Sequence, residues 1–441
     1  MRVLLLHPPG SYKKLSEGGE SLGLGYVAAV LRRDGHEVEI LDANAQCMGV
    51  GEAVREILTR DFDCLGVTAL HEFRNHVISV IQAVRRKKKD ALITVGGYLP
   101  SLETEQFLAK CPEADFLVRG EGEIVIADVL GRIERAEDWR CTPGIAYRGD
   151  GVVVTNPSPP LIQDLDSLPF PARDSLIHIP TLQRPTIAGS RGCYHSCSFC
   201  SINTFYGLSG TSLPRFRSPE SVVDEIESVI ASTGRTAFAF VDDDFIGPGE
   251  KCRERAIRIA EEIRARKLGI TFSIESRADE VDEDILKLMK ECGLTGLFLG
   301  IESGSQRQLD TYNKRITSEQ NRRAIDAVRN LDLSLSSGMI IFDPYTTTDD
   351  MMENLKFIQE TRACDNAALE SRVILYRGAP LTERARADGL LIEKGLDVDY
   401  RFKDRKIAML WRALRAFMAC TAFVKRLKSI CRRGQKKASS S

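Results

Sequence analysis

The sequence predicts an α/β protein with two parallel sheets, the first doubly wound and the second a partial (β/α)6 barrel of TIM type. Two observations predict this fold class. Between residue 1 and about residue 156, short β-branched runs alternate with amphipathic stretches, which is the pattern of βαβ units. A second alternation follows a proline-rich segment, and its six strands are expected at 186–189, 237–241, 270–275, 296–301, 335–342 and 369–375.

Length and composition agree with several domains in one chain. The 441 residues are 43% hydrophobic and 28% charged, which suits a globular protein with more than one core. Around Gly149 and Asp150, two β-branched runs predict a hairpin that closes the first domain at an edge. Five prolines follow, and proline disfavours both helix and central strand. The expected divisions are a first domain at 1–156, an ordered linker at 157–180, a barrel at 181–385 and a basic helical tail at 386–441.

The charge of the chain is unevenly distributed. The formal net charge is −1, yet residues 401–437 hold 13 Lys and Arg against the single Asp404. Apolar residues recur in this segment near helical spacing, which predicts a basic amphipathic helix, or two. Such a helix can contact an acidic protein or an anionic membrane surface, or it can be an ordinary solvated face that covers the barrel. The apolar positions are Ile407, Leu410, Trp411, Leu414, Phe417, Met418, Phe423, Leu427 and Ile430.

The sequence also limits the location and the partners of the protein. No stretch approaches the roughly 20 apolar residues that cross a bilayer, and the first residues lack the plan of a signal peptide. Seven of the twelve cysteines lie far apart in expected strands and helices, as reduced buried thiols do. A cytoplasmic monomer that acts on a small molecule, with no nucleic acid partner, is therefore expected.

Three cysteines differ from the others because they lie close together in one loop. Cys193, Cys197 and Cys200 directly follow the first expected strand of the barrel, so all three can turn toward one centre. Three thiolates suit a cubane cluster with one iron left open, whereas structural zinc needs a closed set of four ligands. His195 is available as a fourth zinc ligand, but within this tight loop its ring competes with the thiolates for space, which favours a solvated or hydrogen-bonded role. Purely structural cysteines are the remaining alternative.

The spacing CxxxCxxC, with Phe199 before the last cysteine, resembles the radical S-adenosylmethionine (SAM) superfamily. The resemblance implies that the three cysteines hold a 4Fe–4S cluster and that SAM chelates the fourth iron. One electron then splits the sulfonium, which gives methionine and a 5′-deoxyadenosyl radical that abstracts hydrogen from a substrate. It also implies an electron donor of the flavodoxin or ferredoxin type.

Polar residues at the ends of the later strands fit the same resemblance, which implies SAM contacts there. Carboxylates and hydroxyls suit an ammonium group and ribose hydroxyls, arginine suits a carboxylate, and the end of the fifth strand is expected to pack against adenine. Acids at strand ends also serve as helix N-caps, so this alternative stays open. The candidate SAM-binding residues are Phe199, Asp242, Asp243, Asp244, Glu275, Arg277, Glu302, Ser303, Gly338 and Ile340.

The first domain resembles the flavodoxin-like, cobalamin-binding module that is fused to many radical SAM enzymes. The matching pieces are HPP at 7–9, LGLGYVAAVLRRDGHEVEILDA at 22–43, VGG at 95–97, RGEGE at 119–123 and LPFPARD at 168–174. The DxHxxG motif that supplies a histidine to cobalt in some cobalamin proteins is missing, and the glycine pair can also serve sheet packing and a turn. The residues implied for cobalamin are Pro8, Pro9, Thr68, Gly96, Gly97, Tyr98, Gly120 and Glu121.

The leading hypothesis that the resemblance implies is a radical SAM enzyme that methylates an unactivated carbon of a metabolite. Cobalamin would be the methyl carrier. One rival is a cobalamin-independent dehydration, deoxygenation or rearrangement of a sugar, aminosugar or lipid-like substrate. A methylthiotransferase is a second rival, but its extra cluster cysteines are not found among Cys47, Cys64, Cys111 and Cys141. A ligand-sensing protein without catalysis is the third.

Overall fold

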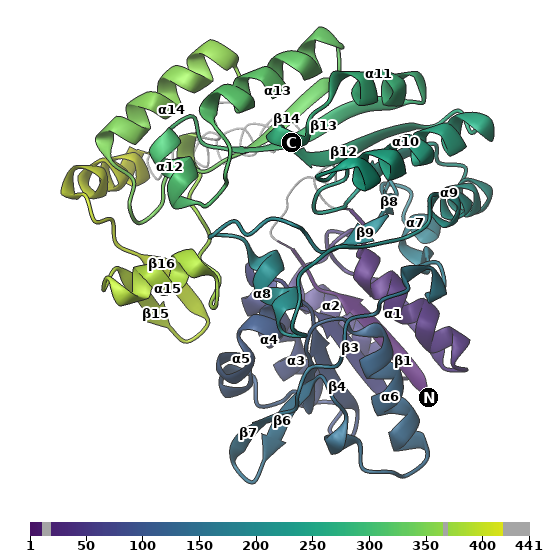
Figure 1. Ribbon diagram of the computed structural model, residues 1–441. Coiled ribbons are helices and arrows are strands. Elements are labelled where there is room, and N and C mark those ends of the chain that lie inside the picture. Colours follow the sequence, from purple (N-terminus) through teal and green to yellow (C-terminus); the bar gives the residue numbers. More distant parts are fainter. Residues whose placement is uncertain (11–18, 365–368, 418–441) are drawn as a thin grey trace, which may run out of the picture.

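The computed structural model describes residues 1–10, 19–364 and 369–417 (Figure 1). One sheet with its helices forms the lower half of the molecule in Figure 1, and the second sheet forms the upper half. A small unit made of a short helix and a hairpin lies beside both. The two sheets therefore belong to two separate layers of structure, as the sequence predicts.

The N-terminal sheet has seven strands in the order β2-β1-β3-β4-β5-β6-β7. The first five strands are parallel, and their order, 2-1-3-4-5, is that of a flavodoxin-like doubly wound fold. The predicted hairpin adds β6 and β7 in antiparallel fashion at one edge. The strands are β1 (Arg2–His7), β2 (Glu37–Asp42), β3 (Cys64–Thr68), β4 (Leu92–Gly96), β5 (Phe116–Val118), β6 (Ile145–Gly149) and β7 (Val152–Thr155).

Helices cover both faces of this sheet. Helices α1 (Leu22–Arg33) and α6 (Glu123–Glu134) bury their apolar sides on one face. Helices α2 (Val50–Thr59), α3 (Arg74–Arg85), α4 (Tyr98–Leu102) and α5 (Thr104–Lys110) cover the other. Strands covered on both sides are nearly all apolar, which explains the continuous β-branched runs in the sequence.

The second sheet is an open parallel barrel of five strands in the order β14-β13-β12-β11-β8. Its strands are β8 (Thr186–Ile187), β11 (Ala237–Phe240), β12 (Thr271–Arg277), β13 (Leu294–Glu302) and β14 (Ser334–Met339). The sixth predicted strand, 369–375, contributes one parallel bridge, between Phe342 and Arg372. Two flanking backbone hydrogen bonds, from Phe342 N to Ser371 O and from Val373 N to Phe342 O, extend this contact without completing a strand.

An outer layer of helices surrounds the barrel strands (Figure 1). Their buried apolar residues and those of the strands form one large core. A short antiparallel pair, β9 (Ser190–Arg191) and β10 (Arg215–Phe216), brackets the cysteine loop. The remaining helices of this half are α7 (Asp174–His178) in the linker, α8 (Ser201–Gly207), α9 (Pro219–Thr233), α10 (Glu250–Ala265), α11 (Glu283–Glu291), α12 (Gln306–Thr311), α13 (Ser318–Asn330) and α14 (Thr348–Thr361).

The C-terminal region differs from the predicted helical tail. Helix α15 (Pro380–Ala387) is followed by an antiparallel hairpin of β15 (Leu391–Lys394) and β16 (Asp397–Tyr400). Gly395 turns the hairpin with a φ of 61°, a conformation that favours glycine. A helix then runs over residues 405–417. The part of the predicted basic helix at 418–441 lies outside the described residues.

The two halves are joined by buried polar and aromatic contacts. Glu225 of α9 accepts hydrogen bonds from Arg173 of the linker and from Arg217, and Arg173 also pairs with Glu20, which precedes α1. Tyr98 of α4 stacks on Phe205 of α8 with 4.3 Å between ring centroids. None of the helices described is long and apolar enough to span a membrane.

Candidate active site between the two sheets

The cysteine loop begins where a glycine is required. Gly192 follows β9 with a φ of 93°, and a Cβ there would lie 2.7 Å from the carbonyl oxygen of Ser212. The loop is fastened by hydrogen bonds from Cys193 N to Ser212 O and from Ser198 N to Tyr312 O. It ends at Cys200, whose sulfur accepts a hydrogen bond from Ile202 N at the start of α8. The loop is thus held from both sides.

The three thiols lie close enough to influence one another. Burial raises the pKa of Cys193 to about 11, and the nearby Cys197 adds to that rise. Burial also raises the pKa of Cys200 to about 12, with contributions from Cys197 and Cys193. Such thiols lose their protons when they bind a metal, because the thiolate is the form that acts as a ligand. Three thiols of one loop within electrostatic reach of one another suit a 4Fe–4S cluster with one open iron.

The geometry of His195 argues against a zinc site shared with the three thiols. Its Nε2 lies 3.5 Å from Asp244 Oδ2 and 3.7 Å from Glu280 Oε1. Both His195 Nε2 and Asp244 Oδ2 are buried without a hydrogen-bond partner among the described residues. The imidazole therefore faces two carboxylates rather than completing a fourth position on the thiols. Two unsatisfied buried atoms beside the cluster loop fit a cationic group such as the ammonium of SAM.

The three successive aspartates after β11 have different surroundings. Asp242 is fully buried and accepts hydrogen bonds from Gly189 N and Ser190 Oγ, and it pairs with Arg255 at 3.1 Å. Its role is to anchor the first barrel strand, so the structure does not bring it to an open site. Asp243 accepts a hydrogen bond from Gly192 N, and Asp244 faces His195.

Asp243 is the acid that reaches the space between the two halves. Its side chain is exposed at this space, and the protein around the carboxyl group raises its pKa to about 7, with contributions from Asp242, Glu275 and Asp244. A carboxyl group held in this way gains a cationic partner readily, because a nearby positive charge offsets the loss of hydration. The pKa of Glu275, at the end of β12, is also raised, by burial and then by Asp242. These two acids and Asp244 are the candidates for polar contacts to SAM.

Arg277 is engaged within the protein. Its guanidinium pairs with Asp279 through two hydrogen bonds of 2.9 and 3.0 Å and donates to the carbonyl oxygen of Lys314. Its Nη1 lies 3.5 Å from Cys197 Sγ. The predicted bidentate contact with a carboxylate is thus made by Asp279. In this arrangement Arg277 places a positive charge next to a cluster ligand.

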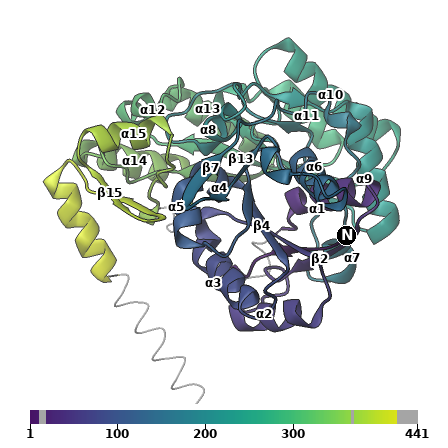
Figure 2. The ribbon, with the colours of Figure 1, turned by 90° about the horizontal axis from the view of Figure 1, so that it is seen from below.

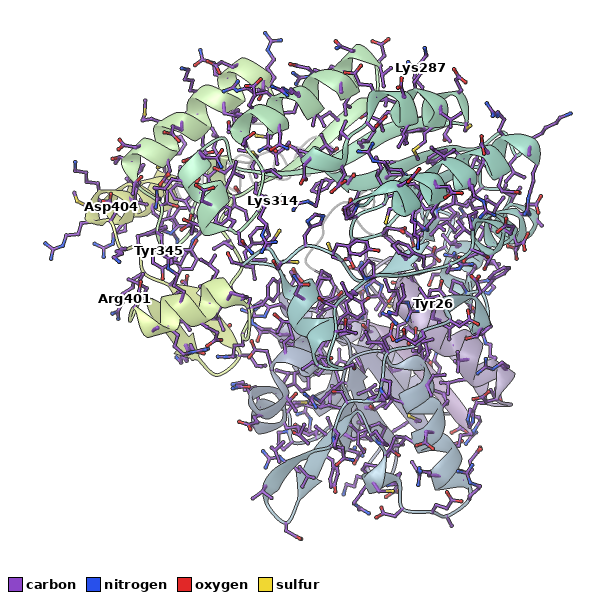
Figure 3. The ribbon with its side chains drawn as sticks, viewed as in Figure 1. Tyr26, Lys287, Lys314, Tyr345, Arg401 and Asp404 are labelled. Atoms are coloured by element: carbon purple, nitrogen blue, oxygen red, sulfur yellow. The ribbon has the colours of Figure 1, made fainter. Side chains whose placement is uncertain are left out.

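The end of β13 presents Glu302 in a strained conformation. Its φ is 60°, which is uncommon for a residue other than glycine and marks functional sites. Its carboxylate pairs at 3.0 Å with the buried Lys314, which lies on the inner side of the barrel half in Figure 3. Ser303, in contrast, is buried and donates to Gln308 and Asn354, away from any open space. Glu302 remains a candidate, whereas Ser303 has a structural role.

The remaining predicted SAM residues differ in their surroundings. Phe199 packs edge-on against Tyr312 with 5.4 Å between centroids. A Cβ on Gly338 would lie 3.1 Å from the ring of Phe298, so glycine keeps this part of the wall open. Ile340 is half-buried, and its backbone N donates to the carbonyl oxygen of Glu302. These contacts fit an aromatic and apolar bed for a flat base.

A cavity of about 570 Å³ lies between the two halves. On the side of the N-terminal domain, residues at the carboxyl ends of the strands line the cavity, and this is where doubly wound sheets bind their ligands. From the barrel it is lined by Ala188, Ser190, Arg191, Val241 and Asp243. Of the residues predicted for cobalamin, six line it, whereas Pro8 and Pro9 do not. The six are Thr68, Gly96, Gly97, Tyr98, Gly120 and Glu121.

Glycines give the backbone of this cavity its shape. Gly97 has a φ of 102°, and a Cβ there would lie 2.9 Å from the carbonyl oxygen of Ala69. Gly120 has a φ of 75° with nothing within 4 Å of its would-be Cβ. These positions leave a smooth floor that suits a flat macrocycle. His71 is not among the lining residues and faces Tyr376, while Tyr98 lines the cavity with its ring stacked on Phe205.

Several lining residues escaped sequence reasoning. Arg191 pairs with Glu121 and Glu123 at 3.0 and 2.6 Å, and its guanidinium lies 4.9 Å from the ring centroid of Tyr26. Tyr26 lies at the junction of the two halves in Figure 3. The only hint in the sequence was that Arg191, a basic residue, directly precedes Gly192 at the start of the cysteine loop. Its partners could not be recognised without the relative placement of the domains.

Two family models match the chain along its length. The model of the radical SAM superfamily matches residues 187–358, and that of the B12 binding domain matches residues 14–130. The chain belongs to the radical SAM superfamily, in the subfamily that carries a cobalamin-binding domain. The radical SAM family implies a 4Fe–4S cluster and SAM, for which the converging thiols and the unsatisfied atoms near them are suited. The B12 domain implies cobalamin, for which the glycine-lined cavity is suited.

Relatives within the radical SAM superfamily carry names for different reactions. The chain is 28% identical over 399 residues to an uncharacterized methyltransferase of Pyrococcus horikoshii, with 89% of this chain and 84% of the relative covered. It is 30% identical over 378 residues to an anaerobic magnesium-protoporphyrin IX monomethyl ester cyclase of Rubrivivax gelatinosus, with coverage of 82% and 66%.

A solved radical SAM structure shares the fold. The structure of the cobalamin-dependent radical SAM enzyme OxsB, with aqua-cobalamin and SAM bound, superposes with a TM-score of 0.81 at 21% identity. The match covers 95% of this chain and 66% of OxsB, so this chain spans about two thirds of that protein. The predicted combination of a flavodoxin-like domain and a radical SAM barrel is thereby confirmed.

Proposed function

We propose that this radical SAM enzyme transfers a methyl group to an unactivated carbon of a small molecule, with cobalamin as the methyl carrier. The observation that carries the proposal is the shared cavity, whose wall combines the glycine-rich strand ends of the B12 domain with Arg191 and Asp243 of the barrel. Names of relatives support it in part, since one is a methyltransferase and another a cyclase.

The chemistry of the bound groups is supplied by the cofactors: the cluster and SAM provide a radical on the substrate, and cobalamin provides the methyl group. The chain binds and orients them. Cys193, Cys197 and Cys200 would hold the cluster, while Asp244, Asp243 and Glu302 would hold polar groups of SAM. Residues of the cavity floor, Gly96, Gly97 and Gly120, would hold cobalamin.

The buried ion pairs between the domains give this arrangement its fixed geometry. Arg191 belongs to the strand that leads into the cysteine loop, and its partners Glu121 and Glu123 belong to the cobalamin side. The same ion pairs therefore hold both cofactor sites in a fixed relative position. Methyl transfer needs such a fixed distance between the reacting groups. Tyr98 and Tyr206 line the same space, and burial raises the pKa of both phenols, so they stay neutral.

We further propose that a flavodoxin- or ferredoxin-type protein delivers the electron and that the enzyme acts as a monomer. The cysteine loop supports the first point, because Tyr194 within it is exposed and marks an approach to the cluster. For the second, the pairing of both cofactor sites within one chain means that no second subunit is needed to complete the cavity.

The test is a product analysis of anaerobically reconstituted protein with a strong reductant. Methyl transfer through cobalamin predicts both S-adenosylhomocysteine, from methylation of the carrier, and 5′-deoxyadenosine, from radical formation. A protein that forms 5′-deoxyadenosine but no S-adenosylhomocysteine in the presence of cobalamin contradicts methylation and favours dehydration or rearrangement. Formation of neither product contradicts the enzymatic proposal altogether.

A further inference from the structure

The helix at 405–417 has two apolar faces instead of one. It begins after Asp404, whose carboxylate accepts a hydrogen bond from Lys406 N. Its first face, Ile407, Trp411 and Leu414, packs against the barrel core, and Trp411 lies 5.0 Å from Phe342 between ring centroids. This face explains how the helix is attached to the body.

The second apolar face has no partner among the described residues. Met409 is 68% exposed, Leu410 44% and Phe417 67%. At 100° per residue this second face adjoins the first, because Leu410 lies beside Leu414 and Met409 lies farthest from it. Lys406 and Ala413 lie between Met409 and Phe417. Figure 2 shows this helix leaving the two main halves, so no other element of the described residues covers its outer side.

Basic side chains border the exposed face. Arg405, Lys406, Arg412 and Arg415 are all exposed, and none of them forms an ion pair with a described residue. Arg401 and Asp404 lie at the outer edge of the molecule in Figure 3, where this helix begins. Residues 418–441, taken as sequence, add seven Lys and Arg and no acid. The surface thus joins apolar and positively charged groups.

We propose that this surface, defined by Met409, Leu410 and Phe417 with the four basic residues around them, docks on an anionic lipid bilayer. A bilayer interface offers acyl chains for the apolar side chains and anionic headgroups for the bordering charges at the same time. The face is a narrow strip that carries Lys406 and Ala413 between its large residues, and a fluid interface accommodates such a mixture of apolar and charged groups. A groove on a protein instead calls for large anchor residues in a compact cluster.

The proposal is independent of the methyl-transfer function, since the residues involved contact neither cofactor site. The apolar residues add the part of the affinity that does not depend on salt, while the basic residues add a part that salt weakens. The helix therefore acts as a peripheral anchor. It lies on the surface and does not span it.

The test is co-sedimentation of the full chain with vesicles of phosphatidylcholine, with and without phosphatidylglycerol. The full chain is expected to bind vesicles that contain phosphatidylglycerol, and to bind less as salt increases. Replacing Met409, Leu410 and Phe417 together by Ser should lower the vesicle partition coefficient by at least about tenfold. Replacing Arg405, Lys406, Arg412 and Arg415 by Gln should remove the preference for phosphatidylglycerol.

The matched control removes exposed apolar side chains elsewhere. Met352 and Leu355 of α14 are 65% and 39% exposed, and their replacement by Ser should leave vesicle binding unchanged. Retained cleavage of SAM by each variant shows that the fold is intact. A full chain that does not bind anionic vesicles overturns the proposal, as does a triple Ser variant that binds like the wild type. Retention on an immobilised acidic flavodoxin without vesicle binding overturns it too, and makes the surface a protein interface.

Discussion

Arg191 Nη1 lies 3.0 Å from Glu121 Oε1, so the strand that enters the cysteine loop is tied directly to the loop that follows β5 of the cobalamin domain. Arg215 pairs with the other oxygen of the same carboxylate at 2.9 Å. Burial raises the pKa of Glu121, but the hydrogen bond from Arg215 and the charge of Arg191 outweigh burial and hold the pKa below its usual value. The carboxylate is therefore the charged centre of the junction between the domains.

Replacing Arg191 by Gln is expected to lower the free energy of unfolding by about 3–5 kcal/mol. The reason is that Glu123 and one carboxylate oxygen of Glu121 lose their buried charge partner. Urea unfolding followed by circular dichroism measures it. Arg258→Gln is the control, since Arg258 is half-exposed in its pair with Glu220, and it should change stability by about 0.5 kcal/mol. Equal effects of the two changes would show that the junction carries no special stability.

The neighbouring acids Asp242 and Asp244 are expected to respond in opposite ways. Asp242→Asn leaves Arg255 buried without its charge partner and should destabilise the fold by about 3 kcal/mol. Asp244→Asn removes a buried charge whose Oδ2 has no partner among the described residues, and the remaining oxygen can still accept from Ser276 Oγ and Arg277 N. Stability should therefore stay within about 1 kcal/mol while SAM affinity falls about tenfold. Thermal unfolding and calorimetric titration of SAM into cluster-loaded protein separate the two. Unchanged SAM binding by the Asp244 variant would remove it from the site.

Filling the cavity should block cobalamin without disturbing the cluster. Gly122 lines the cavity with an ordinary φ of −92°, and a Cβ there would meet only Val118 and Val27, at 3.5 and 3.9 Å. Gly122→Leu is therefore expected to fold and to lower cobalamin affinity at least about tenfold. Gly51→Leu on the exposed side of α2 is the control. A Gly122→Leu protein that keeps full cobalamin affinity would place the ligand elsewhere.

The cluster prediction rests on Cys197. Anaerobically reconstituted wild-type protein should hold about four irons, and Cys197→Ala should lose both the cluster absorption and the cleavage of SAM. Cys292→Ala, which removes a buried thiol near the C-terminal end of α11, should keep them. Iron and sulfide analysis with the visible spectrum provides the measurement. One zinc per wild-type chain, without iron absorption, would contradict the cluster.

The sequence was sufficient for the features that depend on local pattern. Alternating β-branched runs predicted β1 to β5, and the Gly149–Asp150 turn predicted the β6–β7 hairpin. The spacing of Cys193, Cys197 and Cys200 placed the three thiols in one loop, and their shared cluster stays a prediction. Each of these depends on neighbours in the chain, which is why the sequence alone reveals them.

Features that depend on distant pairing were not accessible in this way. Ser303 shares its motif with Glu302, but contacts with Asn354 of α14 bury it. The guanidinium of Arg277 was expected to bind a carboxylate of SAM, yet Asp279 and the Lys314 carbonyl occupy it. The hairpin at 391–400 was missed because its strands are only four residues each, too short for a clear alternating pattern. In each case the deciding partner lies in another element of the fold.

The central claim is that the cavity between the two sheets holds cobalamin next to the radical SAM site. The most direct measurement is the visible spectrum and cobalt content of the full chain after reconstitution with iron, sulfide and hydroxocobalamin, followed by desalting. The account predicts about one cobalamin per chain, with a spectrum that lacks histidine coordination to cobalt. The DxHxxG motif is missing, and His7, which lines the cavity, is buried with its Nδ1 2.9 Å from Asp42 Oδ1. A desalted protein that is free of cobalt but still cleaves SAM would contradict the claim.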